Sequence, residues 1–138
     1  MNRSTQATLS SIAATGLRIC VGVIFLIHGW DKFSAGIPAT TAWLEGLGVE
    51  YAALAAPVVM GAELLAGAAL ILGLATRFAA LVLLIHTSLA WFLVHRGQGF
   101  FVAEGGSEFV ILLAVALAGI ALSGSCRTGL DRFIVRRR

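Results

Sequence analysis

Charged residues are scarce in this sequence. Asp, Glu, Lys and Arg make up 12% of its 138 residues, whereas hydrophobic residues make up 59%. Soluble globular domains carry about 25% charged residues, so this composition excludes an ordinary soluble domain. The mean hydropathy of +0.93 indicates an integral membrane protein instead. The length suits one domain, and no internal repeat is evident.

Cysteines and cofactor-binding motifs are equally sparse. The two cysteines, Cys20 and Cys126, do not form a CxxC pair, and both are expected near the reducing cytoplasmic side. This pattern argues against a structural disulfide and offers little support for a dithiol redox centre within the chain. The sequence contains no GxGxxG, Walker loop, nucleophile elbow or zinc-ligand spacing. Dinucleotide binding and phosphoryl transfer therefore have no basis, and the signal for a metal site is weak.

Long apolar runs account for most of the chain. The predicted membrane-spanning helices lie at about residues 11–30, 53–74, 77–95 and 108–124. Each is close to the roughly 20 residues that a bilayer core requires. No small-residue cleavage site closes the first run, so we expect it to be retained rather than removed as a signal peptide. Because Gly73–Arg77 is a short connection, the sequence predicts an all-α, integral membrane, antiparallel four-helix bundle.

The positive charges predict an orientation. If both termini lie on one side, that side carries every Lys and Arg except Lys32 and Arg96. The positive-inside rule then places both termini in the cytoplasm. The tail at 127–138 is expected to lie along anionic head groups, although a basic tail that only fixes the topology is an equal alternative. The net charge of +3 is an orientation signal, so the expected partner is the lipid bilayer and not nucleic acid.

Three ionisable residues are predicted to share a layer inside the membrane. With a rise of 1.5 Å per residue, Arg18, Glu63 and His86 lie about 18, 15 and 14 Å below the outer boundary. An isolated charge at that depth costs about 2.5 to 3.5 kcal/mol on insertion scales. We therefore expect Arg18 and Glu63 to form an ion pair, with His86 beside them. The sequence leaves open whether this intramembrane polar layer is structural or functional.

A second, outer layer is a candidate ligand site. Its residues are His28, Trp30, Lys32, Trp91, His95 and Glu108. Lys32 is expected to pair with Glu108, and the two histidines match in depth. Imidazoles beside carboxylates suit a quinone head group better than a metal, because no local ligand spacing is present. Trp30 or Trp91 would supply a stacking wall, while hydrated histidines and a snorkelling Lys32 are the alternative explanation.

Several pieces together resemble a known family. They are the stripe Arg18, Gly22, Phe25, Gly29 and Lys32, which is expected to face neighbouring helices, the run AELLAGAALILGLATR, the segment EGGSE ending at Glu108, and the ending GLDRF. In order and spacing they resemble the DoxX family of small four-helix membrane proteins over about residues 15–133. The family's polar signature falls on Arg18, Lys32, Glu63 and Glu108. Where many members carry Gly-Pro-Gly, this chain has Gly124, Ser125 and Cys126.

The resemblance implies a membrane subunit of a quinone-linked or oxidative-stress-related redox system in a bacterial-type cytoplasmic membrane. Quinone is then the implied cofactor, and a redox protein partner and a homo-oligomer are left open. The alternative is a non-enzymatic membrane scaffold or small-solute carrier with structural charges, so whether the chain is an enzyme is also open. Aromatic and polar groups converging on a lipid-accessible cleft would favour the redox function, and a sealed core would favour the alternative.

Overall fold

A computed structural model describes residues 2–124 and 129–131, and all regular structure among them is helical. The elements are α1 (Arg3–Ala35), α2 (Ile37–Gly46), α3 (Ala52–Leu72), α4 (Thr76–Ala90), the π-helix η1 (Trp91–His95), the 3₁₀-helix η2 (Val102–Glu104) and α5 (Glu108–Ser123). By length and composition, α1, α3 and α4 with η1 can each cross a membrane, and α5 is a shorter apolar helix. The predicted all-helical membrane fold is confirmed.

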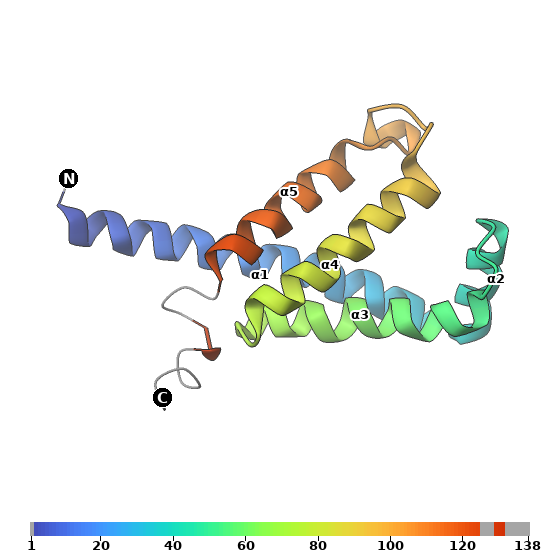
Figure 1. Ribbon diagram of the computed structural model, residues 1–138, viewed down its shortest axis with the longest axis horizontal. Coiled ribbons are helices and arrows are strands. Elements are labelled where there is room, and N and C mark those ends of the chain that lie inside the picture. The colour runs from blue at the N-terminus through green and yellow to red at the C-terminus, as the bar shows by residue number, and fades with distance from the viewer. Residues whose placement is uncertain (1, 125–128, 132–138) are drawn as a thin grey trace.

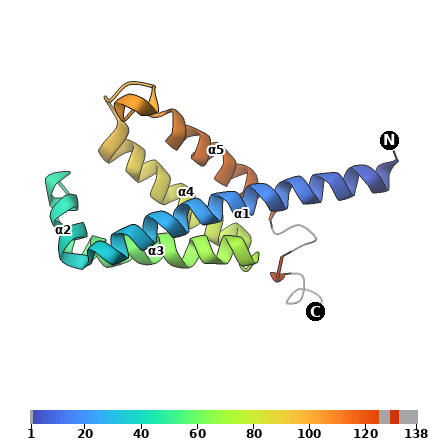
Figure 2. The same ribbon diagram turned by 180° about the vertical axis from the view of Figure 1, so that it is seen from behind.

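The helices form two antiparallel pairs, α1 with α3 and α4 with α5 (Figure 1). The pairs meet at the α3–α4 turn, here called the narrow end, where residues 129–131 also lie. They diverge toward the opposite, wide end, which carries α2 and the connection from η1 to α5 (Figure 2). This arrangement, with a fifth α-helix, differs from the single four-helix bundle that the sequence predicts.

Both ends of α1, Arg3 and Ala35, lie outside the predicted span 11–30. Helix α1 has 33 residues, about 50 Å at 1.5 Å per residue and longer than a bilayer core of about 30 Å. Its first turns project beyond the other helices at the narrow end (Figure 1). It ends at Ala35 and is capped by Gly36, whose φ of +88° suits glycine, and Pro38 then occupies the first turn of α2. The predicted amphipathic tail, 127–138, falls outside the described residues except for 129–131.

Glycines set the register between α1 and α3. A Cβ at Gly22 would lie 2.8 Å from the Gly67 carbonyl oxygen, and a Cβ at Gly29 would lie 2.9 Å from the Cβ of Glu63. Small residues permit such close approach between membrane helices. The predicted stripe on α1 is confirmed, because Arg18, Gly22, Phe25 and Gly29 are all buried.

The main core lies where the two pairs meet. Leu70, Leu83 and Leu117 are fully buried and belong to one cluster that joins α3, α4 and α5. A separate small cluster of Leu44, Ala52 and Ala56 joins only α2 and α3 at the wide end. The apolar core thus holds the pairs together at one end and leaves them apart at the other.

Candidate functional site

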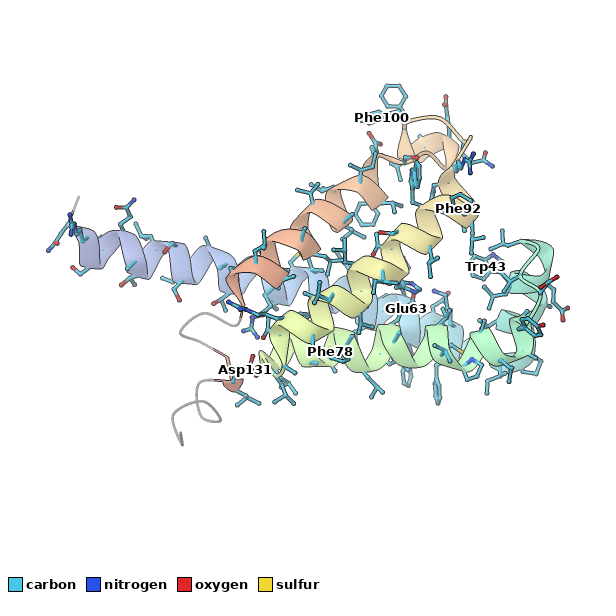
Figure 3. The ribbon with its side chains drawn as sticks, viewed as in Figure 1. Trp43, Glu63, Phe78, Phe92, Phe100 and Asp131 are labelled. Atoms are coloured by element: carbon cyan, nitrogen blue, oxygen red, sulfur yellow. The ribbon has the colours of Figure 1, made fainter. Side chains whose placement is uncertain are left out.

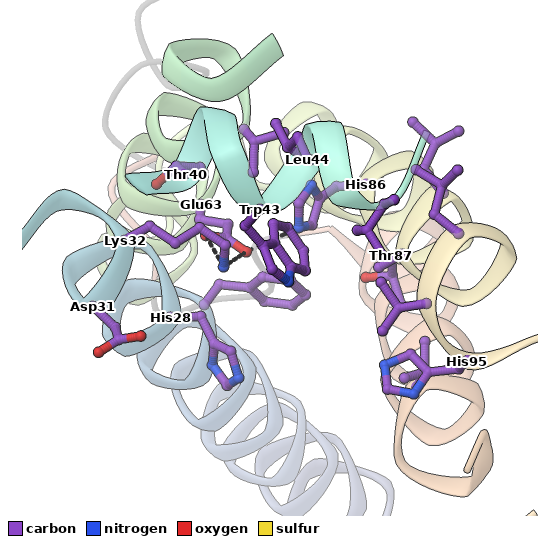
Figure 4. A pocket seen from close by; sticks show the side chains of 18 of the residues that line it. His28, Asp31, Lys32, Thr40, Trp43, Leu44, Glu63, His86, Thr87 and His95 are labelled. Atoms are coloured by element: carbon purple, nitrogen blue, oxygen red, sulfur yellow. Dashed lines mark hydrogen bonds and ion pairs between the residues drawn. The ribbon is translucent and has the colours of Figure 1, made fainter. Parts of the chain in front are cut away.

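A cleft of about 880 Å³ lies between the two helix pairs toward the wide end. Side chains from α1, α2, α3, α4, η1 and α5 line it, and most of them are apolar. Figure 4 looks into the cleft, with α1 on one side and α4 on the other. A concave, mainly apolar site with a few polar groups is the usual form of a small-molecule site.

Three polar residues form a charged cluster in this cleft: Lys32, Glu63 and His86. The Glu63 side chain is 4% exposed, and both of its oxygens lie 2.9 Å from the Lys32 Nζ. The Nε2 of His86 is also 2.9 Å from Glu63 Oε1 (Figure 4). Burying a carboxylate is costly unless it is paired and hydrogen-bonded. Here Lys32 pairs with the carboxylate, and the hydrogen bonds from Lys32 and His86 are made to Oε1.

The helix register explains this pairing. Gly29 packs directly on Glu63, and Lys32 follows Gly29 by three residues, on the same face of α1. His86 comes from α4, and its ring meets that of Phe25 edge to face, with centroids 6.1 Å apart. The predicted neighbourhood of Glu63 and His86 is therefore confirmed, and Lys32 joins it.

The predicted ion pair of Arg18 and Glu63 is wrong. Arg18 is 3% exposed, and its Nη1 donates to the Leu70 carbonyl oxygen at 2.8 Å. The depth count ended helix one near residue 30, whereas α1 continues to Ala35 and its register with α3 puts Arg18 opposite the end of α3. Arg18 thus belongs to the narrow end.

Residues 129–131 pack on this narrow end and are here called the C-terminal clamp. Asp131 Oδ1 accepts from the Ala75 amide at 2.6 Å, and Oδ2 accepts from the Thr76 amide at 3.1 Å. The Asp131 amide donates to the Gly73 carbonyl at 3.0 Å. A carboxylate at the first amides of α4 also interacts favourably with the positive end of that helix's dipole. The clamp therefore closes the α3–α4 turn (Figure 3).

The predicted pair of Lys32 and Glu108 is also wrong. Glu108 Oε1 accepts from the Val102 amide at 2.7 Å, within the connection between η1 and α5. Trp91 Nε1 donates to Ser107 Oγ at 3.0 Å in the same connection. Neither Glu108 nor Trp91 lines the cleft. Glu108 and Trp91 are not in the cleft because their side chains form hydrogen bonds within their own loop.

The remaining outer-layer residues divide between two places. His28 and His95 line the cleft, with Nδ1 atoms 2.8 Å from the Ile24 carbonyl and 2.6 Å from the Gly105 carbonyl. Trp30 is 63% exposed and lies against Phe33, with ring centroids 5.7 Å apart, so it is not a wall of the cleft. Within the described ranges, 2–124 and 129–131, no group of three or more His, Cys, Asp or Glu residues is arranged to hold a metal ion.

Trp43 is a cleft residue that the sequence analysis does not single out. Helix α2 places it in the cleft. The spacing Thr40, Trp43 and Leu44 is typical of one face of a helix, and this signal was available in the sequence.

Comparison with known proteins identifies the family. A family model described as DoxX matches residues 13–96. The "Putative oxidoreductase CatD" of Bacillus subtilis (strain 168) is 32% identical over 136 residues, which cover 99% of this chain and 93% of that protein. The "Inner membrane protein YqjF" of Escherichia coli (strain K12) is 27% identical over 133 residues, or 94% of this chain and 97% of that protein.

A shorter match completes the comparison. An uncharacterized protein of Haemophilus influenzae is 36% identical over 77 residues, which cover 56% of this chain and only 51% of that protein. No solved structure matches this chain. The DoxX match covers more than half of the sequence, and the match to the Bacillus protein runs nearly end to end. This chain is therefore a membrane protein of the DoxX family.

Proposed function

We propose that this protein is a membrane subunit of a quinone-linked redox system and that its cleft binds the quinone head group. The observation that carries the proposal is the charged cluster of Lys32, Glu63 and His86 within a mainly apolar cleft. The cleft is open rather than sealed, which is the feature expected of a ligand site and not of a purely structural ion pair. The relative named as an oxidoreductase adds support.

The cluster has the groups that this chemistry needs. A quinone takes up two electrons and two protons on reduction, and its carbonyl oxygens accept hydrogen bonds. Lys32 and His86 are suitable donors, and Glu63, which touches both, is a suitable group to hold or pass on a proton. The electrons would come from a partner redox protein, since the sequence contains no dinucleotide or dithiol motif.

We also propose that the narrow end faces the cytoplasm of a bacterial inner membrane and the wide end faces outward. Arg3 and Arg77 lie on the narrow side, whereas Lys32 and Arg96 lie toward the wide end. Cytoplasmic segments carry the excess of Lys and Arg. The match to an inner membrane protein supports the same location. The cleft would then open near the outer head groups, within reach of a lipid-soluble quinone.

Quinone content of the purified protein tests the proposal. The protein is extracted with its native lipid in polymer-bounded discs, and quinone per protein is compared with quinone per lipid in the parent membrane. We expect enrichment in wild type and its loss in Glu63→Gln and Lys32→Met, because each change removes a cleft group. Glu45→Gln, an exposed acid of α2 that does not line the cleft, is the matched control and should keep the enrichment.

Two results would contradict the proposal. The first is wild-type protein with no more quinone than its surrounding lipid. The second is enrichment that persists unchanged in Glu63→Gln and Lys32→Met. Either result, together with a loss of stability in Glu63→Gln, would favour the scaffold or carrier function with structural charges.

A further inference from the structure

Trp43 is a large aromatic side chain that lines the cleft. It projects from α2 into the cleft, beside the charged cluster in the view of Figure 4. The residue is 47% exposed, although it lines a cavity. Tryptophan gains much of its packing energy from contact with its ring faces. An indole held in a cleft with half of its surface uncovered is therefore available to a ligand.

The neighbours of Trp43 hold it in this position. Thr40 and Leu44 are buried, and Leu44 packs with Ala52 and Ala56 of α3. Because α2 is anchored through these side chains, its orientation is set by packing on α3 and does not depend on Trp43. Removing the indole should therefore leave the helix in place.

Other aromatic rings stand near the charged cluster. Phe25 of α1 is 5% exposed and meets the His86 ring edge to face. The cleft thus has aromatic groups from α1, α2 and α4 around Lys32 and Glu63. Aromatic rings prefer offset or edge contacts with other planar rings. A planar ring against Trp43 would gain such contacts while its polar substituents faced the cluster.

We infer that Trp43 is the ring-stacking residue that determines the specificity of this site, and that the ligand is a planar ring with carbonyl or hydroxyl substituents and a hydrocarbon chain. The inference rests on the proposed quinone site. It adds that the site selects ligands with a planar ring, as well as ligands that can accept hydrogen bonds from Lys32 and His86. The apolar lining beyond the cluster, which includes Ile24, Leu93 and Leu113, suits the chain.

Ligand binding to the complete protein in lipid nanodiscs tests this inference. Equilibrium dialysis would measure the Kd of decyl-benzoquinone for wild type, Trp43→Leu, Trp43→Phe and Trp30→Leu. We expect Trp43→Leu to raise the Kd about three- to tenfold, since aromatic contacts contribute about 0.5 to 1.5 kcal/mol beyond the area they bury and about 1.4 kcal/mol corresponds to a factor of ten. Trp43→Phe keeps a ring and should stay within about threefold. Trp30, which lies outside the cleft, is the matched control and should have no effect.

A second measurement uses only unaltered protein. Decyl-cyclohexane-1,4-dione has the same carbonyl groups and chain on a ring that is not planar. The dione and unlabelled decyl-benzoquinone would each compete with labelled decyl-benzoquinone for the wild-type protein. We expect the dione to need a concentration at least about tenfold higher for half-maximal displacement. This competition remains decisive if Trp43→Leu does not fold.

The outcomes separate the inference from the function on which it rests. Saturable quinone binding that is equally tight in wild type and folded Trp43→Leu overturns the role of Trp43 and leaves the proposed function standing. Equal displacement by the dione overturns the selection of planarity. If wild type shows no saturable binding at all, both the inference and the proposed function are wrong.

Discussion

The two ends of the molecule differ in how they surround an inward-facing cation of α1. At the narrow end, Arg18 donates to a backbone carbonyl and is packed against Gly73 and the clamp. At the wide end, Lys32 reaches a carboxylate inside an open cleft. Both cations lie on one face of one helix, so their sequence context is similar. The difference shows that the packing around a charge, and not the charge itself, distinguishes a closed structural site from a site with room for a ligand.

The cause of this difference lies in where the helix pairs are joined. Leu70, Leu83 and Leu117 bring α3, α4 and α5 together toward the narrow end, and Asp131 caps the first turn of α4. At the wide end, the small cluster around Leu44 does not reach α4 or α5. Substitutions at the narrow end should therefore change stability alone, whereas substitutions at the wide end should change both stability and ligand binding.

The largest expected effect is the difference in cysteine labelling between the two ends, which tests which end faces the outside of the cell. Asn2→Cys and Ala103→Cys are made separately in a Cys20→Ser, Cys126→Ser background. On intact cells, a membrane-impermeant maleimide should label Cys at 103 and should label Cys at 2 only after permeabilisation, because the Lys and Arg bias predicts that the narrow end lies inside. Equal protection of the two positions, or the reverse pattern, would show that the ends are assigned wrongly.

At the wide end, Glu63→Gln should destabilise the protein by about 3 kcal/mol in detergent, because it leaves Lys32 without its counter-charge. The Lys32 side chain is 20% exposed, so the effect should lie at the lower end of the range for buried pairs. Adding Lys32→Met should restore more than half of the loss. Unfolding monitored by circular dichroism measures both, and Glu45→Gln is the control.

A double-mutant cycle sharpens the same prediction. Glu63→Gln and Arg18→Met should have additive effects to within about 0.5 kcal/mol, since the two side chains belong to different ends. Glu63→Gln and Lys32→Met should couple by about 1 kcal/mol or more. Strong coupling to Arg18 instead of Lys32 would mean that the charged cluster has been assigned to the wrong cation.

At the narrow end, Gly73→Ala should cost about 2 kcal/mol of unfolding free energy. The φ of +67° is strained for a residue with a Cβ, and the added Cβ would meet Arg18 and lie 2.5 Å from the Cα of Gly129. Gly61→Ala on the same helix meets nothing within 4 Å and is the matched control. That control should be neutral or gain up to about 1 kcal/mol from helix propensity. Equal effects at both glycines would argue against a tightly closed narrow end.

The smallest effect is expected for Asp131→Asn. The amide keeps one acceptor but loses the charge at the first turn of α4, so the expected loss is about 1 kcal/mol. Asp31→Asn, at an exposed acid in the cleft, should change stability by less than about 0.5 kcal/mol. Quinone content should stay at the wild-type level in Asp131→Asn. A loss of quinone there would show that the two ends are not independent.

The amino-acid pattern alone is enough to predict the long apolar helices and the buried face of α1. The predicted span 53–74 corresponds to α3 at Ala52–Leu72, and the stripe through Gly22, Phe25 and Gly29 is buried as expected. These features are local, because a segment of about 20 apolar residues satisfies its own backbone hydrogen bonds as a helix in lipid. The family was likewise visible in the order of the motifs.

Which side chains meet depends on how the helices pack against one another. Counting depth along separate helices placed Arg18 beside Glu63, but the contact of Gly22 with Gly67 sets a register in which Lys32 takes that position. The divergence of α4 and α5, and with it the cleft, depends on side-chain packing between helices far apart in sequence. Trp43 became a cleft residue only because α2 folds back onto α3. The register of α1 on α3, the angle at which the helix pairs cross and the packing of α2 on α3 all arise from contacts between segments. The periodicity within one segment does not encode these contacts.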